Sequence, residues 1–203
     1  MYNYNLGVFF ESVVSGSPDS PAILLSEDEK ISFKELNCLS NQIARYLLDL
    51  KVNKYDVIGI FNNKKRESFA LIIACLKIGA IYVNLDGTSP FERLKKIIDR
   101  CSPILLFYDQ TEISKLLKDF RIPKIDICSE NFGNELKSFS DTNLESALSI
   151  CSDNPAYIMF TSGSTGFPKG AVMTHQNLLN FIQWAKLTYS IDKNDILTNV
   201  NPM

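Results

Sequence analysis

DVIGIFNNKKRESFALIIACLKIGAIYVNL, residues 56–85, is the stretch that decides the fold class. Its first part, DVIGIF, is short, apolar and rich in β-branched residues, which is typical of a buried strand. ESFALIIACLKIG follows as a helical segment and ends on Gly79, a residue type that commonly terminates helices. AIYVNL is a second strand-like run. A strand, a helix and a strand in this order predict parallel strands joined by a crossover helix.

Capping boxes predict the starts of two further helices. Ser32 and Glu35 have capping-box spacing in front of apolar residues that recur at helical intervals. Ser89 and Glu92 have the same spacing, and Pro90 lies where the first helical turn would begin. We therefore expect one amphipathic helix behind each box.

The alternation of strands and helices continues along the chain. SENFGNELKSFSDTN, residues 129–143, loses periodicity and predicts a loop or an insertion, and ILTNVNPM, residues 196–203, is a strand-like run without a turn or cap. We expect an α/β fold with a parallel-type sheet flanked by helices. The other predicted elements are the strands PILLFYD (103–109), KIDIC (124–128), AYIMFTS (156–162) and GAVMT (170–174) and the helices TEISKLLKDF (111–120) and QNLLNFIQWAKLTY (176–189).

Composition narrows the class of protein and its partners. The 203 residues suffice for one domain, and 45% apolar residues can fill its core. Lys and Arg total 21 against 23 acidic residues, which gives a net charge of −2. This balance provides no basic surface for a polyanion, so no nucleic-acid partner is expected.

The sequence predicts neither a secretory signal nor a membrane span. No basic segment precedes the short apolar stretch near the N-terminus. The longest uninterrupted apolar run, residues 69–76, is far shorter than the roughly 20 residues that a span needs. The five cysteines lack the paired spacing of zinc or redox sites, so we expect reduced, mostly buried thiols and no metal site. These features favour the cytoplasm.

TSGSTGFPKG, residues 161–170, is the segment with the clearest chemistry. Its glycines allow close approach to a ligand, and its hydroxyl and backbone N–H groups can surround phosphates, to which Lys169 adds a charge. The triphosphatase loop pattern does not fit, because Pro168 precedes the lysine and Gly170 follows it. The dinucleotide fingerprint does not fit either, because a strand-like run follows instead of a helix.

Three stretches resemble one family. YIMFTSGSTGFPKGAVMTHQNL, residues 157–178, resembles the phosphate-binding signature of the adenylate-forming (AMP-binding) superfamily, which includes acyl-CoA synthetases, luciferases and peptide-synthetase adenylation domains. Residues 31–47 resemble the first family motif, and residues 76–109 resemble the second with the helix and strand after it. The second stretch is most similar to amino-acid adenylation domains of non-ribosomal peptide synthetases and D-alanine carrier-protein ligases. Asn84 departs from the proline that is usual in that pattern.

The resemblance implies a ligase that joins a carboxylate, by this pattern an amino acid, to ATP as an acyl-adenylate. Pyrophosphate is released, and the acyl group passes to a carrier-protein thiol or another thiol. The substrate carboxylate is already ionised, so the protein needs to position it and stabilise charge rather than supply a base. The implied cofactors are ATP and Mg²⁺, and no residue is assigned as catalytic. The residues implied to bind the nucleotide are Thr161, Ser162, Gly163, Ser164, Thr165, Gly166 and Lys169.

The same resemblance makes residues 1–203 the N-terminal portion of an adenylation domain, without the C-terminal part of that domain or the small C-terminal domain. We expect the isolated chain to be poorly stable and inactive. Two alternatives remain open, namely the N-terminal part of an acyl-CoA ligase and a truncated, non-catalytic nucleotide-binding or interaction remnant. The acid, the acceptor and the oligomeric state do not follow from the sequence.

Two further features near the C-terminus receive structural interpretations. His175 is the only histidine, and its place at a predicted helix entry favours a structural role. Phe181, Ile182 and Trp184 are expected on the core face of the helix that follows.

Overall fold

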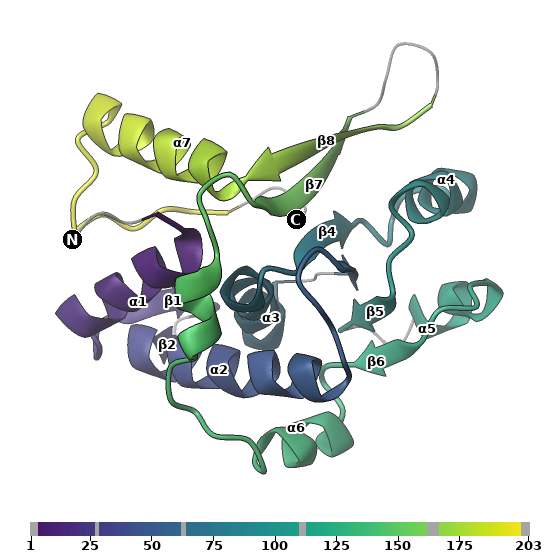
Figure 1. Ribbon diagram of the computed structural model, residues 1–203, viewed down its shortest axis with the longest axis horizontal. Helices are drawn as coiled ribbons and strands as arrows, with labels where there is room; N and C mark the ends of the chain where they lie inside the picture. The colour runs from purple at the N-terminus through teal and green to yellow at the C-terminus, as the bar shows by residue number, and fades with distance from the viewer. Residues whose placement is uncertain (1–3, 27–28, 62–63, 110–112, 162–166, 200–203) are drawn as a thin grey trace.

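The computed structural model describes residues 4–26, 29–61, 64–109, 113–161 and 167–199, and within them six strands form one central sheet (Figure 1). Their order is β6-β5-β3-β4-β7-β8. The first five are parallel, and β8 is antiparallel to β7. The structure is therefore α/β, as predicted. The strands are β3 (Val57–Phe61), β4 (Ile81–Leu85), β5 (Leu105–Tyr108), β6 (Lys124–Asp126), β7 (Pro155–Thr161) and β8 (Lys169–Thr174), and a separate antiparallel pair consists of β1 (Pro21–Leu24) and β2 (Lys30–Ser32).

The strand–helix–strand unit predicted in residues 56–85 is confirmed. β3 pairs in parallel with β4 along its whole length, and α3 (Arg66–Ile78) connects the two strands. The helix ends at Gly79, whose φ of 74° lies in the left-handed region that glycine adopts at little cost. A Cβ at this position would lie 2.7 Å from Cδ1 of Ile150, so packing also requires glycine there.

Helices cover both faces of the parallel strands, as buried parallel sheets require. Ile58 of β3 and Phe107 of β5 pack with α2 and α3, whereas Phe61 and Leu106 of the same strands pack with α4 and α5. Figure 1 shows α1, α2 and α3 grouped on one side of the sheet and α4 and α5 on the other. The bounds of these helices are α1 (Leu6–Gly16), α2 (Phe33–Asp49), α4 (Phe91–Cys101) and α5 (Ile113–Leu116), and a 3-10 turn (Leu117–Asp119) follows α5.

One of the two predicted capping boxes is present. The Ser32 hydroxyl accepts the Glu35 N–H at 3.2 Å, and the Glu35 carboxylate accepts the Ser32 N–H at 2.8 Å. The box predicted at Ser89 is wrong, because α4 has Pro90 as its N-cap without a side-chain hydrogen bond. The Ser89 hydroxyl instead donates to Asp86 at 3.3 Å. The Ser89 hydroxyl is therefore bound to the Asp86 carboxylate of the preceding turn and does not cap α4.

The segment predicted as a loop, residues 129–143, contains a short helix, α6 (Glu130–Leu136). Ser129 caps it by accepting the Phe132 N–H at 3.3 Å, and Phe132 and Leu136 are buried. These two apolar side chains, one turn apart, pack into the same core cluster as α2 and α3. Residues 145–149 form a second 3-10 turn (Glu145–Ser149), and residues 196–199 form no strand, although a strand-like run was predicted there.

The C-terminal elements lie where they were predicted, but their packing differs. β8 forms an antiparallel hairpin with β7, whereas the other strands of the sheet are parallel, and α7 (His175–Thr188) follows directly. The prediction that Phe181, Ile182 and Trp184 line the core is wrong, because all three are exposed. Within the described residues, the helix contacts an apolar cluster only through Leu178 and Leu179 near its N-terminal end.

The thiol prediction is confirmed in part. All five cysteines are free, but Cys75 is the only buried one, and Cys128 and Cys151 are exposed. In the part of the chain that the structure describes, no helix combines the length and apolar character needed to cross a bilayer.

A fully buried lysine joins three helices. Nζ of Lys77 on α3 lies 3.0 Å from Oε1 of Glu11 on α1, and it donates to Oδ1 of Asn37 on α2 at 2.6 Å and also to Oδ1 of Asn41. Burial lowers the pKa of Lys77, and the Glu11 carboxylate opposes that shift. A buried ammonium is tolerated only when its donors are paired, so this network fixes α1 and α2 against α3.

Lys77→Met is expected to lower the free energy of unfolding by about 3–5 kcal/mol, because Glu11 and two amide oxygens lose their buried partner. Urea unfolding followed by far-UV circular dichroism measures the change. Lys95→Met is the control, since Lys95 pairs with Asp99 at 2.6 Å in solvent and its loss is expected to leave stability almost unchanged. Equal losses in the two variants would contradict the role of the buried network.

Candidate functional site

The carboxyl ends of β3, β4 and β7 meet at one edge of the sheet. These three strands are parallel neighbours, and Lys64, Asp86 and Thr161 lie at or just beyond their carboxyl ends. Ligands of open α/β sheets commonly bind outside this edge. The edge next to β7 is therefore the candidate site.

The β7–β8 hairpin brings together the two ends of the predicted phosphate loop. Thr161, the last residue of β7, is paired with Lys169, the first residue of β8, and its hydroxyl donates to the Lys169 carbonyl at 3.5 Å. Both side chains are exposed, so a ligand can reach them. The other predicted phosphate-binding residues, Ser162, Gly163, Ser164, Thr165 and Gly166, lie outside the described residues.

Side-chain packing fixes the segment that follows the predicted phosphate loop, residues 167–170. Pro168 is buried, and a Cβ on Gly170 would lie 3.0 Å from the ring of Phe160, so only glycine fits there without displacement. The ring of the exposed Phe167 lies under the ammonium of Lys96 on α4, 4.6 Å from its centroid. A positive charge from α4 therefore lies beside the loop, and the sequence analysis did not identify it.

The turn after β4 satisfies its own polar groups. Oδ1 of Asp86 accepts the Thr88 N–H at 2.9 Å and the Thr88 hydroxyl at 2.7 Å. These hydrogen bonds, the Thr88 hydroxyl above all, hold the pKa of Asp86 below its usual range. The Asp86 carboxylate therefore stays ionised, and it accepts hydrogen bonds from groups of its own turn. The sequence DGTS was a readable turn signal for this arrangement, because Asp commonly bonds to a residue two positions ahead.

The segment after α7 returns to the same edge of the sheet. The carbonyl of Asn199 accepts a hydrogen bond from Nζ of Lys64 at 2.7 Å. Lys64 shortly precedes the start of α3 and follows the carboxyl end of β3. Residues near 199 thus lie beside the predicted ligand edge, although they are far from β3 in sequence.

A cavity of about 610 Å³ lies elsewhere, between α2, the start of α3 and α6. Arg66, Glu67, Cys128 and Ser129 are among its lining residues. Its lining residues Ile127, Cys128 and Ser129 directly follow β6, which β5, β3 and β4 separate from β7. We therefore do not connect this cavity with the loop. Among the described residues, no cluster of His, Cys, Asp and Glu could hold a metal ion.

His175 attaches the base of the hairpin to the first helix. Its Nδ1 accepts the Leu6 N–H at 3.1 Å, and its own backbone N–H donates to the Asn154 carbonyl at 3.1 Å. The imidazole is completely buried, and burial together with the charge of Lys54 lowers its pKa to about 4. An imidazole that accepts at Nδ1 carries its proton on Nε2, so the neutral tautomer is defined. This agrees with the structural role predicted for the residue.

Residues 10–203 match the family described as AMP-binding enzyme. The chain belongs to this family of adenylate-forming enzymes. Gramicidin S synthase 2 of Brevibacillus brevis is 30% identical over 199 residues, which are 98% of this chain and 4% of that protein. The chain therefore spans a small part of this relative.

Solved structures show the same fold. The N-terminal subdomain of Klebsiella oxytoca NpsA matches with a TM-score of 0.72 and 22% identity, over 85% of this chain and 42% of that one. VinN in complex with 3-methylaspartate matches with a TM-score of 0.82 and 17% identity, over 94% and 54%. NpsA has also been solved as an artificially fused adenylation–PCP di-domain, with a TM-score of 0.73 and 21% identity over 87% and 34%. About half or more of each solved chain has no counterpart in these 203 residues.

His175 is expected to titrate near pH 4 in the folded protein. Because this pKa lies below the ordinary 6.5, the unfolded chain binds the proton more tightly. The stabilisation is fully present above pH 6.5 and is lost as the pH falls to 4, by about 3 kcal/mol in total. NMR titration of this single imidazole and urea unfolding at several pH values measure both effects. A midpoint near 6.5 would show that the ring is not buried as described.

Proposed function

We propose that this chain supplies the phosphate-binding part of an enzyme that activates an amino acid with ATP. The products are an aminoacyl-adenylate and pyrophosphate, and the acyl group then passes to a carrier-protein thiol or another thiol. The observation that carries the proposal is the loop sequence TSGSTGFPKG in an AMP-binding enzyme, with its ends held together at Thr161 and Lys169 beside the carboxyl edge of the sheet.

The choice of an amino acid rests on the relatives. A dimodular nonribosomal peptide synthase of Bacillus subtilis is 28% identical over 191 residues, and VinN was solved with an amino acid, 3-methylaspartate. The carrier-protein acceptor is supported by the fused adenylation–PCP structure of NpsA. We further propose that residues 1–203 form the N-terminal portion of an adenylation domain, that they are inactive alone, and that they work in the cytoplasm.

In this proposal the protein binds and orients charge and does not abstract a proton. The substrate carboxylate attacks the α-phosphate of ATP, and pyrophosphate leaves as that oxygen–phosphorus bond forms. The hydroxyl and backbone N–H groups of residues 161–166 hold the β and γ phosphates, and Mg²⁺ enters as part of MgATP. The hydroxyl of Thr161 and the ammonium of Lys169 are both exposed and fit a solvated, negatively charged ligand.

ATP–pyrophosphate exchange tests the proposal in the intact polypeptide that contains this chain. A panel of amino acids and fatty acids is assayed, and exchange stimulated by one or a few amino acids is expected. Exchange with fatty acids alone would make the protein an acyl-CoA ligase. ATP binding without exchange for any acid would identify a non-catalytic nucleotide-binding module and contradict the proposed enzyme.

Thr161→Ala is expected to lower kcat/KM for ATP about tenfold, the equivalent of roughly 1.4 kcal/mol for a lost hydrogen bond to a charged group. Lys169→Ala is expected to lower it less than threefold, because the exposed ammonium is screened by solvent. Steady-state exchange kinetics measure both variants, and Thr161→Ser serves as the control that keeps the hydroxyl. An equal loss of kcat/KM in the two alanine variants, or a larger loss in Lys169→Ala, would contradict the greater importance of Thr161.

Lys96→Met is expected to raise KM for ATP less than about threefold with little change in kcat, because its exposed ammonium is screened by solvent as that of Lys169 is. The ammonium of Lys96 lies over Phe167 at the loop exit, and no ion pair within the described residues neutralises it. Lys95→Met changes the same charge on the same helix, but Lys95 is paired with Asp99. The same KM in both variants would exclude a specific contribution from Lys96.

A further inference from the structure

The cavity between α2, the start of α3 and α6 has the size of a metabolite site. Its volume of about 610 Å³ lies within the range of roughly 300–1,000 Å³ that is usual for small-molecule pockets. It lies at the carboxyl end of β6, the edge at which open α/β sheets commonly bind ligands. Figure 1 shows α6 at the bottom of the view and the β7–β8 hairpin at the top, so this cavity and the predicted phosphate loop are separate places.

Hydrogen bonds hold the chain on both sides of α6, which forms one wall of the cavity. Before the helix, the Ser129 hydroxyl donates to the Asp126 carbonyl at 2.8 Å and accepts the Phe132 N–H at 3.3 Å. After the helix, Nη1 of Arg45 on α2 donates to the Thr142 carbonyl at 2.6 Å. The cavity is therefore present in the protein without a ligand, as is usual for small-molecule sites.

The lining combines apolar and charged side chains. Its apolar residues can pack against a hydrocarbon body; they are Leu39, Ile127, Phe132 and Leu136. Its charged residues are balanced in sign; they are Arg66, Lys137, Glu67 and Glu130. A lining of this kind favours a small molecule with an apolar body and at most a single charge.

Arg66 is the residue of this lining that can bind a carboxylate. Its Nε lies 2.7 Å from Oε1 of Glu67, and its two Nη groups donate no hydrogen bond to any group of the described residues. Nζ of Lys137, in contrast, donates to Oδ1 of Asn134 at 2.9 Å. The two Nη groups of a guanidinium match the two oxygens of a carboxylate. Because Glu67 already balances part of the charge of Arg66, a singly charged anion suits the site better than a phosphate dianion.

We propose that this cavity is a second ligand site, which binds a small carboxylic acid with an apolar body. The carboxylate pairs with the Nη groups of Arg66, and the apolar body packs against Phe132 and Leu136. β5, β3 and β4 lie between β6 and β7, so this ligand is not the nucleotide of the predicted phosphate loop. The proposal does not depend on the proposed function.

Cys128 reports on occupancy of the cavity. Its thiol is free and the residue is exposed, and it belongs to the lining. Partial burial and the carboxylate of Glu67 raise the pKa of Cys128, so it serves as a reporter and not as a nucleophile. Cys151 is the matched control, because it is also free and exposed but does not line the cavity.

Alkylation by N-ethylmaleimide, read by peptide mass spectrometry, tests the proposal in the intact polypeptide that contains this chain. Saturating 3-phenylpropanoate is expected to slow alkylation of Cys128 at least fivefold and that of Cys151 less than twofold. Acetate, which lacks the apolar body, and 3-phenylpropanamide, which lacks the charge, are each expected to slow Cys128 less than twofold.

Three outcomes of this experiment would overturn the proposal. An unchanged rate at Cys128 with 3-phenylpropanoate would show that the acid does not bind in the cavity. The same slowing by the amide would show that Arg66 does not select a carboxylate. A Cys128 thiol that does not react even without ligand would show that the cavity is covered in the intact polypeptide.

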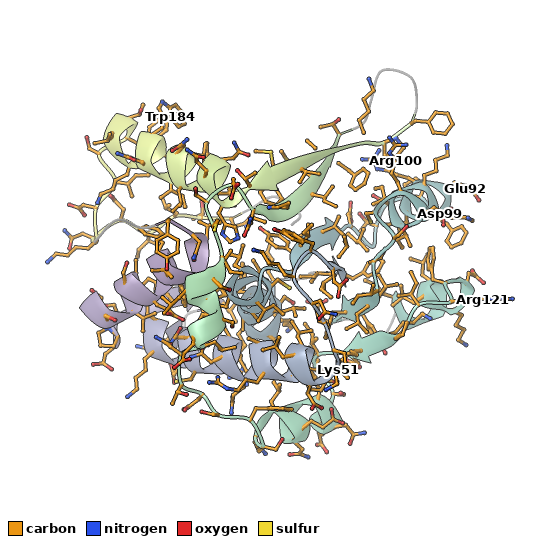
Figure 2. All side chains as sticks on the ribbon, in the orientation of Figure 1. Lys51, Glu92, Asp99, Arg100, Arg121 and Trp184 are labelled. Carbon is orange, nitrogen blue, oxygen red and sulfur yellow. The ribbon has the colours of Figure 1, made fainter. Side chains whose placement is uncertain are left out.

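A pair of arginine variants tests the contact directly. Arg66→Met is expected to remove the slowing of Cys128 by 3-phenylpropanoate, because the Nη groups are lost. Arg100→Met is the control, since Arg100 is also exposed and lies on α4; Figure 2 shows it in the upper right of the view, away from α6. Slowing that persists in Arg66→Met would overturn the proposal, including the case in which the acid binds elsewhere and acts on Cys128 indirectly.

A pair of glycine variants gives an independent readout by filling the cavity. A Cβ on Gly133 of α6, which belongs to the lining, would have no atom within 4 Å, and the same holds for Gly16 of α1, which lies outside it. Neither glycine has a positive φ, so leucine fits both helices and is expected to leave the midpoint of urea unfolding unchanged or raised. Gly133→Leu is expected to abolish the slowing of Cys128, whereas Gly16→Leu retains it. Retention of the slowing in a folded Gly133→Leu variant would contradict binding in this cavity.

Discussion

Each parallel strand has to bury two faces, and most of this structure follows from that requirement. The crossover helices α3 and α4 lie on opposite faces, and alternate side chains of β3 supply one apolar cluster on each side. The layer of α1, α2 and α3 then encloses the ammonium of Lys77, which is paired with groups from the other two helices. The β7–β8 hairpin is less completely covered within the described residues, since Met159 and Val172 are exposed, and the two ends of the predicted phosphate loop lie there.

The parts of the fold that were predictable have local causes. The helix stop at Gly79 and the capping box at Ser32 depend on residues within a single turn, so periodicity and capping patterns were sufficient. The box at Ser89 failed because Asp86, three residues earlier, competed for the same hydroxyl. The interior position expected for Trp184 failed for another reason. An apolar pattern along a helix does not by itself say whether its apolar side chains are buried within the same chain.

For the candidate site, the sequence identified the loop but not its surroundings. The residues of the loop are consecutive, so their chemistry can be read directly from the chain. Lys96 could not have been assigned from sequence, because its relation to Phe167 depends on how α4 packs beside the hairpin. The same holds for Lys64 and Asn199, which are 135 residues apart and meet at the carboxyl edge of the sheet. Contacts of this kind are determined by topology and have no local pattern.

The hydrogen bond between Leu6 and His175 spans 169 residues of sequence, and this separation has a consequence for folding during synthesis. At translation rates of about 5–20 residues per second, the first helix emerges roughly 10 to 30 seconds before the imidazole that binds its N-terminus exists. Until then α1 can pack on α2 and α3, but the N–H of Leu6 has only water as a partner. His175 at the start of α7 therefore completes the hydrogen bonding at the start of α1, and a ribosome that stalls before His175 would hold a nascent domain in which α1 is packed but lacks this partner.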